Sequence, residues 1–287
     1  MNHPTKPLPT PGATKVAQVT APRGPRKNMS TLIAHSTYLS WRSIKALLRQ
    51  PIFLVITLIQ PMIWLLLFGK LFGSVVQIPG FPQGTSYIEF LTPGVIAMTA
   101  LFSAMWAGTV YIDDMQRGVM DRLLASPVRR GAMVNGTLAY QSVTSIVQTV
   151  IVLVVAVLAG ARFDGGAVGV VVTLVSACLL TVICAALSNA IALMARQREA
   201  LIGISQFLSL PMTFLSSAIM DPALAPHWIQ VAARYNPLDW AVVASRETLL
   251  GNPDWSMVWP RLAALLLLAV VMAALATRTF RAYQRSL

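Results

Sequence analysis

Residues 113–130, with the sequence DDMQRGVMDRLLASPVRR, hold the side chains of this chain that are best suited to chemistry. The adjacent carboxylates of Asp113 and Asp114 could act as an acid and base pair or as metal ligands. Nothing nearby completes either chemistry, since the chain has 3 histidines and none lies near this stretch: His3, His35 and His227. We therefore expect no catalytic site and no metal site, and the polar stretch needs another explanation.

The composition indicates a membrane protein, because 56% of the residues are hydrophobic, 11% are charged and the mean hydropathy is +0.66. The apolar residues gather into runs near the length of about 20 residues that a helix needs to cross a bilayer. The runs are continuous rather than alternating, which favours helices over a β-barrel. We predict an all-α membrane protein with six transmembrane helices, over about 52–72, 91–112, 133–160, 168–195, 201–220 and 257–277.

The basic residues predict the orientation of these spans. Of the 22 Lys and Arg residues, 17 fall before the first span, after the last span, or in the second-to-third and fourth-to-fifth loops. Five remain for the other side: Lys70, Arg162, Arg234, Arg246 and Arg261. The positive-inside rule therefore places both termini and residues 113–130 in the cytoplasm of a multipass plasma-membrane protein. The net charge of +12 follows from this topology and not from nucleic-acid binding.

The region before the first span divides into two parts. Residues 1–30 are rich in proline and predict a disordered cytosolic tail, so residues 31–287 form a single transmembrane domain. Residues 38–50, YLSWRSIKALLRQ, predict an amphipathic helix in the membrane interface, with its basic side chains among lipid phosphates. A cytosolic extension of the first span is the alternative.

The source of energy must lie outside the chain. The Gly69-Lys70 pair has no Gly five residues earlier and no Ser or Thr after it, so it is not a P-loop. The centres of the predicted spans lack the charged residues that ion-coupled carriers normally keep there. We therefore expect the energy to come from a partner that binds in the cytoplasm.

Residues 113–130 are the best candidate for that contact. Over residues 113–125 they predict a short amphipathic helix, which Ser126-Pro127 ends. Its polar face carries Asp114, Arg117 and Asp121. Its apolar face carries Val119 and Leu123. Such a helix can fit a groove on a soluble domain. A solvated loop whose charges only keep it in the cytoplasm is the alternative.

Uncharged polar residues within the spans are candidates for a path that an amphiphile could follow. Four share one face of the third span, and three more lie in other spans: Gln141, Thr144, Ser145 and Gln148, with Gln60, Asn189 and Gln206. Hydrogen bonds between helices are the alternative role for these groups.

On the outer side, residues 221–256 are too long for a turn and too broken for a further span. Pro226 and Asn236-Pro237 each predict the start of a short helix, with Asn236 as the cap and Pro237 in the first position. Tryptophans cluster in this region and suit the membrane interface.

These features together resemble the permease subunits of type-2 ABC exporters, and among them the daunorubicin-resistance permease group. Three segments carry the likeness, in the family's order and spacing: residues 49–73 with RQP and LLLFGKLFG, RGVMDRLLASPVRR, and YNPLDWAVVASRETLLG over residues 235–251. The chain departs from many members at Gln116 and Asp121, where they have Glu, and at Val119, where they have Thr.

The resemblance implies a separate ATP-binding subunit in two copies, which holds the ATP and Mg, while this chain binds no cofactor and is not itself an enzyme. It also implies a second permease, either another copy or a related chain, and export of a hydrophobic or amphiphilic compound such as a drug, a polyketide or a lipid. A coupling helix would dock on the ATP-binding subunit through Asp114, Arg117, Gly118, Asp121, Arg122, Leu123, Leu124 and Pro127. A re-entrant helix pair would close the outer exit at Asn236, Pro237, Asp239 and Trp240. The alternatives are a gradient-driven carrier without an ATPase and a membrane scaffold that transports nothing.

Overall fold

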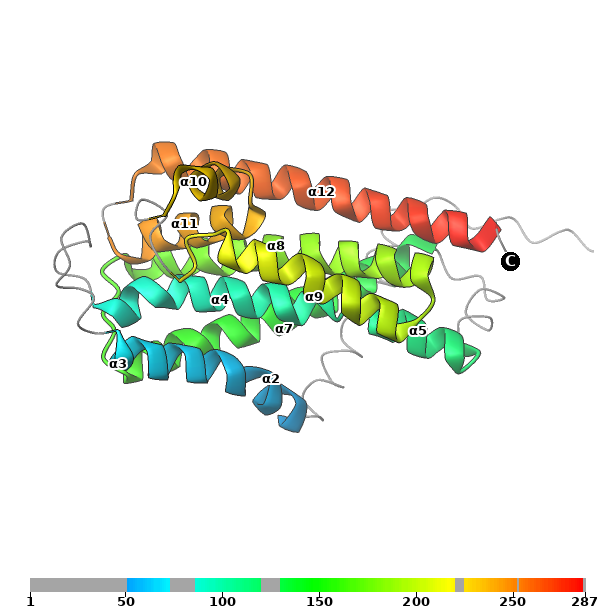
Figure 1. Ribbon diagram of the computed structural model, residues 1–287, viewed down its shortest axis with the longest axis horizontal. Coiled ribbons are helices and arrows are strands. Elements are labelled where there is room, and N and C mark those ends of the chain that lie inside the picture. Colours follow the sequence, from blue (N-terminus) through cyan, green and yellow to red (C-terminus); the bar gives the residue numbers. More distant parts are fainter. Residues whose placement is uncertain (1–50, 73–85, 120–129, 220–224, 252, 286–287) are drawn as a thin grey trace, which may run out of the picture.

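The computed structural model describes residues 51–72, 86–119, 130–219, 225–251 and 253–285. Every regular element among them is a helix, as predicted, and most run along one axis of an elongated bundle (Figure 1). The predicted tail (1–30), the interfacial helix (38–50) and the later coupling residues (Asp121 to Pro127) lie outside the described residues. In chain order the helices are α2 (Pro51–Ile63), the π-helix η1 (Trp64–Phe68), α3 (Gly69–Leu71), α4 (Tyr87–Met105), α5 (Thr109–Gln116), α7 (Arg130–Leu158), α8 (Gly166–Ala195), α9 (Arg198–Phe214), α10 (His227–Arg234), α11 (Pro237–Leu249) and α12 (Trp255–Arg285).

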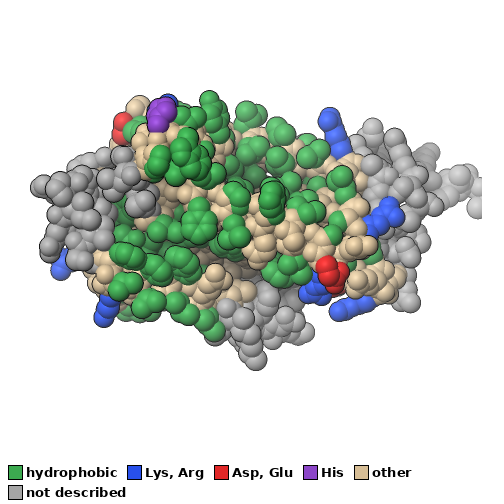
Figure 2. All heavy atoms as spheres, in the orientation of Figure 1, with side chains coloured by type: hydrophobic (Ala, Val, Ile, Leu, Met, Phe, Trp, Pro, Cys, Tyr) green, Lys and Arg blue, Asp and Glu red, His purple; other side chains and the backbone are tan. Residues whose placement is uncertain are grey.

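Within the described residues, 4 helical stretches are long and apolar enough to cross a membrane. They overlap the second, third, fourth and sixth predicted spans: Tyr87–Gln116, Val134–Leu158, Gly166–Ala195 and Trp255–Phe280. The first predicted span corresponds to α2, η1 and α3, and the fifth corresponds largely to α9, which has 17 residues. In Figure 2, hydrophobic side chains cover the middle of the visible face, and charged ones lie toward its two ends. This distribution is the one that a bilayer around the bundle requires.

Helix α8 forms the centre of the bundle, where it packs against α4, α7, α11 and α12. Its buried side is rich in small residues that let neighbouring backbones come close: Gly169, Ala177, Ala185, Ala186, Ser188 and Ala192. In contrast, α12 lies at the edge of the bundle and exposes large apolar side chains such as Leu267 and Val271. We interpret that exposed side as lipid-facing.

A break between α4 and α5 divides the helix that overlaps the second predicted span. Gly108 packs so closely on α8 that a Cβ there would collide with the carbonyl oxygen of Ser188. The Ser188 hydroxyl accepts from the Gly108 N–H (3.0 Å) and donates to the Met105 carbonyl (2.6 Å). The Ser205 hydroxyl of α9 donates to the same carbonyl (3.1 Å). Side chains from two other helices therefore replace the backbone bonds lost at the break, which is how a membrane tolerates one.

The expected continuous helix over residues 113–125 is wrong. The span helix continues past residue 112, so Asp113 and Asp114 belong to the last turn of α5, which ends at Gln116. Gly118 then has φ 65°, a left-handed conformation that glycine adopts without a steric penalty. Consequently, Asp114 cannot share one face of an unbroken helix with residues beyond Gly118.

Two short helices, α10 and α11, precede α12 and confirm the predicted helix starts. Asn236 caps α11, since its side-chain oxygen accepts from the Leu238 N–H (3.0 Å), and Pro237 occupies the first helical position. Helix α11 is not a surface element, because it packs against α8, α12 and α4. Helix α11, which carries the predicted gate residues Pro237, Asp239 and Trp240, therefore lies among the long helices at one end of the bundle (Figure 1).

Candidate transport cavity and outer gate

A cavity of about 720 Å³ lies between α2, α4, α5, α7 and α9. Helix α7 contributes a polar stripe to its wall, because residues three and four apart share a helix face. Four of the seven residues predicted to form a substrate path line it: Gln60, Gln141, Thr144 and Gln148. The structure thus brings side chains from two distant helices to one cavity.

Of the polar residues in this wall, Gln148 also joins two helices, whereas Thr144 bonds within its own helix. The Gln148 side-chain amide donates to the Thr57 hydroxyl on α2 (3.4 Å), and the Thr144 hydroxyl donates to the Tyr140 carbonyl (3.0 Å). The Gln148 side-chain oxygen is buried and has no hydrogen-bond partner among the described residues. An unused acceptor at the wall of a cavity suits a ligand that brings a donor.

The other three predicted path residues do not line the cavity. Ser145 is buried elsewhere, and Gln206 is exposed on α9. The Asn189 side-chain amide donates to the Thr137 hydroxyl (3.2 Å), which is also hydrogen-bonded to the Tyr111 hydroxyl (3.1 Å). Asn189 therefore joins α8 to α7 and α5, which is the alternative role expected from the sequence.

Aromatic side chains form much of the remaining wall, and sequence reasoning missed them. They come from four separate helical segments: Trp64, Phe102, Trp106, Tyr140 and Phe214. Apolar residues are common throughout the spans, so no local signal separates these five from lipid-facing or core residues. A wall of aromatic rings with a few uncharged polar groups suits a hydrophobic or amphiphilic ligand.

One end of the cavity carries an ion pair. Arg198, the first residue of α9, lies 3.3 Å from the Asp113 carboxylate of α5, and both side chains line the cavity. The pair is half-exposed, so its contribution to stability is about 0.2–1 kcal/mol. Asp113, the carboxylate first considered for acid and base chemistry, instead connects α5 to α9.

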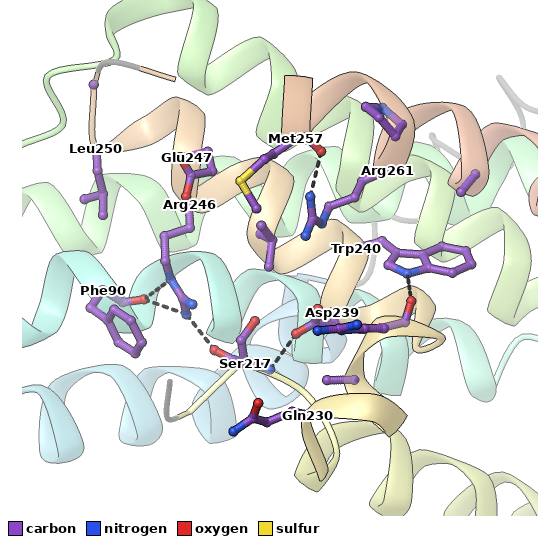
Figure 3. A pocket seen from close by; sticks show the side chains of 16 residues that line it. Phe90, Ser217, Gln230, Asp239, Trp240, Arg246, Glu247, Leu250, Met257 and Arg261 are labelled. Carbon is purple, nitrogen blue, oxygen red and sulfur yellow. Dashed lines mark hydrogen bonds between the residues drawn. The ribbon is translucent and has the colours of Figure 1, made fainter. Parts of the chain in front are cut away.

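At the opposite end of the bundle, a second pocket of about 800 Å³ lies between α10, α11 and α12 (Figure 3). The backbone of Ser217, just beyond α9, forms hydrogen bonds with two side chains of α11. Its N–H donates to the Asp239 carboxylate (2.8 Å), and its carbonyl accepts from Arg246 (2.7 Å). Arg246 also donates to the Phe90 carbonyl and stacks 3.7 Å from the centre of the Phe90 ring. These contacts join the end of α9 to α11 and to the start of α4.

Asn236 strengthens the same junction. Its side-chain amide donates to the carbonyls of Met212 (2.6 Å) and Leu215 (2.9 Å) at the end of α9, while its oxygen caps α11. Of the other predicted gate residues, Pro237 begins α11, and the Trp240 indole donates to the Arg234 carbonyl of α10 (2.8 Å). All four predicted gate residues therefore lie in one structural unit. Ser217, at its centre, was missed because nothing in its sequence neighbourhood marks it.

The fold and these sites define a class: a multipass, all-helical membrane protein with a cavity among its helices and two short helices, α10 and α11, at one end. The sequence matches the ABC-2 type transporter family over residues 36–250. The chain belongs to this family, which confirms the resemblance found in the sequence.

The chain is similar to curated permeases of bacteria and algae. It is 28% identical to the daunorubicin resistance ABC transporter permease protein DrrB1 of Streptomyces coeruleorubidus, over 91% of this chain and 90% of the relative. It is also 28% identical to the putative transport permease ycf38 of Porphyra purpurea, over 72% of this chain and 71% of the relative. A probable doxorubicin resistance ABC transporter permease protein, DrrC of Mycobacterium tuberculosis, is 21% identical over 70% of this chain and 74% of its own length. This chain is thus a membrane permease subunit of an ABC transporter.

Proposed function

We propose that the chain exports a hydrophobic or amphiphilic compound, such as a drug, a polyketide or a lipid, and that separate ATP-binding subunits supply the energy. The observation that carries this proposal is the cavity of about 720 Å³, whose wall combines aromatic rings with uncharged polar groups. The names of the bacterial relatives agree with a drug-like substrate. ATP and Mg are held by the partner, and this chain binds neither.

The proposed topology has six spans, formed by α2 to α3, α4 to α5, α7, α8, α9 and α12, with both termini in the cytoplasm of a plasma-membrane protein. Two contacts support it. The Asp113–Arg198 pair joins the end of the second span to the start of the fifth, as expected of two cytosolic loops. At the other end, the Glu89 carboxylate accepts from the Arg162 N–H (2.8 Å), joining the start of α4 to the turn before α8. Helix α9 is about 26 Å long, enough for most of the hydrocarbon layer.

The proposed mechanism begins at the segment after α5, which docks on the ATP-binding subunit. Because α5 leads directly into that segment, its displacement would act on α5 and, through Asp113, on Arg198 of α9. The other end of α9 is fixed to α11 by Asn236 and, just beyond α9, by Asp239. Helix α9 would therefore link the ATP-driven step to the outer gate. Two ATP-binding subunits and two permeases complete the transporter.

Filling the cavity tests this function. Ser103 lines it from α4, so Ser103→Phe introduces a phenyl ring into the path. Ala263 is exposed on α12, so Ala263→Phe adds the same group facing lipid. In inside-out vesicles that contain the chain and its ATP-binding partner, we expect Ser103→Phe to slow ATP-dependent uptake of an aromatic amphiphilic dye, and Ala263→Phe to leave it unchanged. Equal uptake by the wild type and Ser103→Phe, at equal expression, would overturn the assignment of the cavity.

A further inference from the structure

The pocket between α10, α11 and α12 has a charge distribution that the gate alone does not explain. Three of the five basic residues assigned to the outer side line it: Arg234, Arg246 and Arg261. Each comes from a different helix: Arg234 from α10, Arg246 from α11 and Arg261 from α12. Two carboxylates, Asp239 and Glu247, line the same pocket. Full ionisation of the five groups leaves one net positive charge, which favours an anionic ligand.

The structure assigns different roles to these arginines. Arg246 donates to two backbone carbonyls and holds the junction with α9. Arg261 uses one guanidinium nitrogen to donate to the Met257 carbonyl (2.8 Å), which leaves its other donors for a ligand. Neither Arg234 nor Arg261 forms an ion pair with a carboxylate in the described part of the chain, although two carboxylates line the same pocket. Two guanidinium groups are therefore available, and their planar, multi-donor geometry suits an oxyanion such as phosphate.

The position of the pocket indicates where such a phosphate would come from. Trp255 and Trp259 lie at the start of α12, with ring centres 5.7 Å apart, and Trp240 lines the pocket itself. Tryptophans of this kind concentrate at the level of the lipid headgroups. The pocket thus opens at the depth where phospholipid phosphates lie.

An apolar strip on α12 runs from this pocket toward the middle of the bilayer. Pro260 and Ala264 line the pocket, and Leu267, Val271 and Leu275 follow at the spacing of one helix face. The side chains of Leu267, Val271 and Leu275 are 68%, 50% and 45% exposed. From Arg261 to Leu275 the helix rises about 21 Å, more than the roughly 15 Å of one leaflet's hydrocarbon. An acyl chain can therefore lie along this strip while its headgroup occupies the pocket.

We propose that this pocket binds one anionic phospholipid of the outer leaflet. Arg234 and Arg261 bind its phosphate, and the strip from Ala264 to Leu275 holds an acyl chain. The bound headgroup bridges α10 and α12 across the first turn of α11, and so stabilises the closed arrangement of the outer gate. This inference uses the membrane orientation proposed above but does not depend on the transported compound or on ATP hydrolysis.

The test measures lipid binding by the full-length chain in detergent, without ATP or substrate. Spin-labelled phosphatidylglycerol and phosphatidylcholine report the relative association of each lipid, and soluble glycerol phosphate is the competitor. We expect a preference for phosphatidylglycerol that weakens as salt rises. Arg234→Gln and Arg261→Gln should each reduce this preference by about tenfold, as expected for loss of a charge-assisted bond. Arg162→Gln, which removes an outer positive charge away from the pocket, is the matched control and should change nothing.

Each result decides between lipid, soluble phosphate and nonspecific charge. Equal binding of the two lipids by the wild type would overturn the proposal, and this measurement needs no variant to fold. If Arg162→Gln lowered the preference for phosphatidylglycerol as much as the pocket variants do, the preference would come from general surface charge, and the proposal would be wrong. Displacement of the labelled lipid by millimolar glycerol phosphate would assign the pocket to a soluble phosphate compound instead. Because ATP-dependent uptake is measured separately, failure of this proposal would leave the proposed function intact.

Discussion

Replacing Asn236 tests whether the outer gate is fixed to α9 or is only a well-capped helix. Asn236 is buried and makes three hydrogen bonds, one as the cap of α11 and two as a donor to α9. Losing the cap costs about 1 kcal/mol, and losing each bond to a carbonyl costs about 1 kcal/mol more. We therefore expect Asn236→Ala to lower the free energy of unfolding by about 3 kcal/mol.

Asn236→Asp separates the two roles, because Asp caps a helix as well as Asn does but has no amide to donate. At neutral pH its carboxylate would replace the amide that now lies within 2.9 Å of the Met212 and Leu215 carbonyls. The loss should be at least about 2 kcal/mol. Reversible unfolding of the purified protein in mixed detergent micelles, followed by circular dichroism, gives both values. An Asn236→Asp protein within about 0.5 kcal/mol of the wild type would refute the link to α9 and leave only the cap.

Three further perturbations address the break, the ion pair and the turn. Ser188→Ala leaves the Gly108 N–H without its bond, and the same unfolding experiment should show a loss of about 1–2 kcal/mol; no loss would mean that the break needs no side-chain support. A double-mutant cycle with Asp113→Asn and Arg198→Gln should give a coupling energy of about 0.2–1 kcal/mol that falls with added salt; a coupling that salt does not change would contradict a half-exposed pair. Gly118→Val forces a branched residue to φ 65°, so it should reduce transport per ATP hydrolysed while leaving expression intact. Unchanged transport in vesicles would mean that this turn has no role in coupling ATP hydrolysis to transport.

Features that depend on neighbouring residues could be predicted from the sequence. Asn236 and Pro237 predict the start of α11 because helix capping depends only on residues within one turn of the helix. The long helices follow from continuous apolar runs, whose lengths are set by the bilayer. The stripe of Gln141, Thr144 and Gln148 was recognised because helical spacing places all three on one face.

Features that depend on distant contacts could not be predicted. The break at Gly108 lies in an uninterrupted apolar run, and the serines that stabilise it are 80 and 97 positions further along the chain. The aromatic cavity wall is assembled from separate helices, whose relative rotation no local pattern encodes. The turn at Gly118 was missed because this glycine was counted within the amphipathic pattern of residues 113–125, although its freedom at positive φ favoured a turn.

We propose that this permease moves an amphiphile only when a separate subunit hydrolyses ATP. The most direct test is uptake of an amphiphilic dye into proteoliposomes that contain the chain alone, the ATP-binding partner alone, both proteins, or both with the P-loop lysine of the partner replaced by alanine. We expect ATP-dependent uptake only when both intact proteins are present. Uptake by the chain alone, at the rate of the complete system, would contradict it.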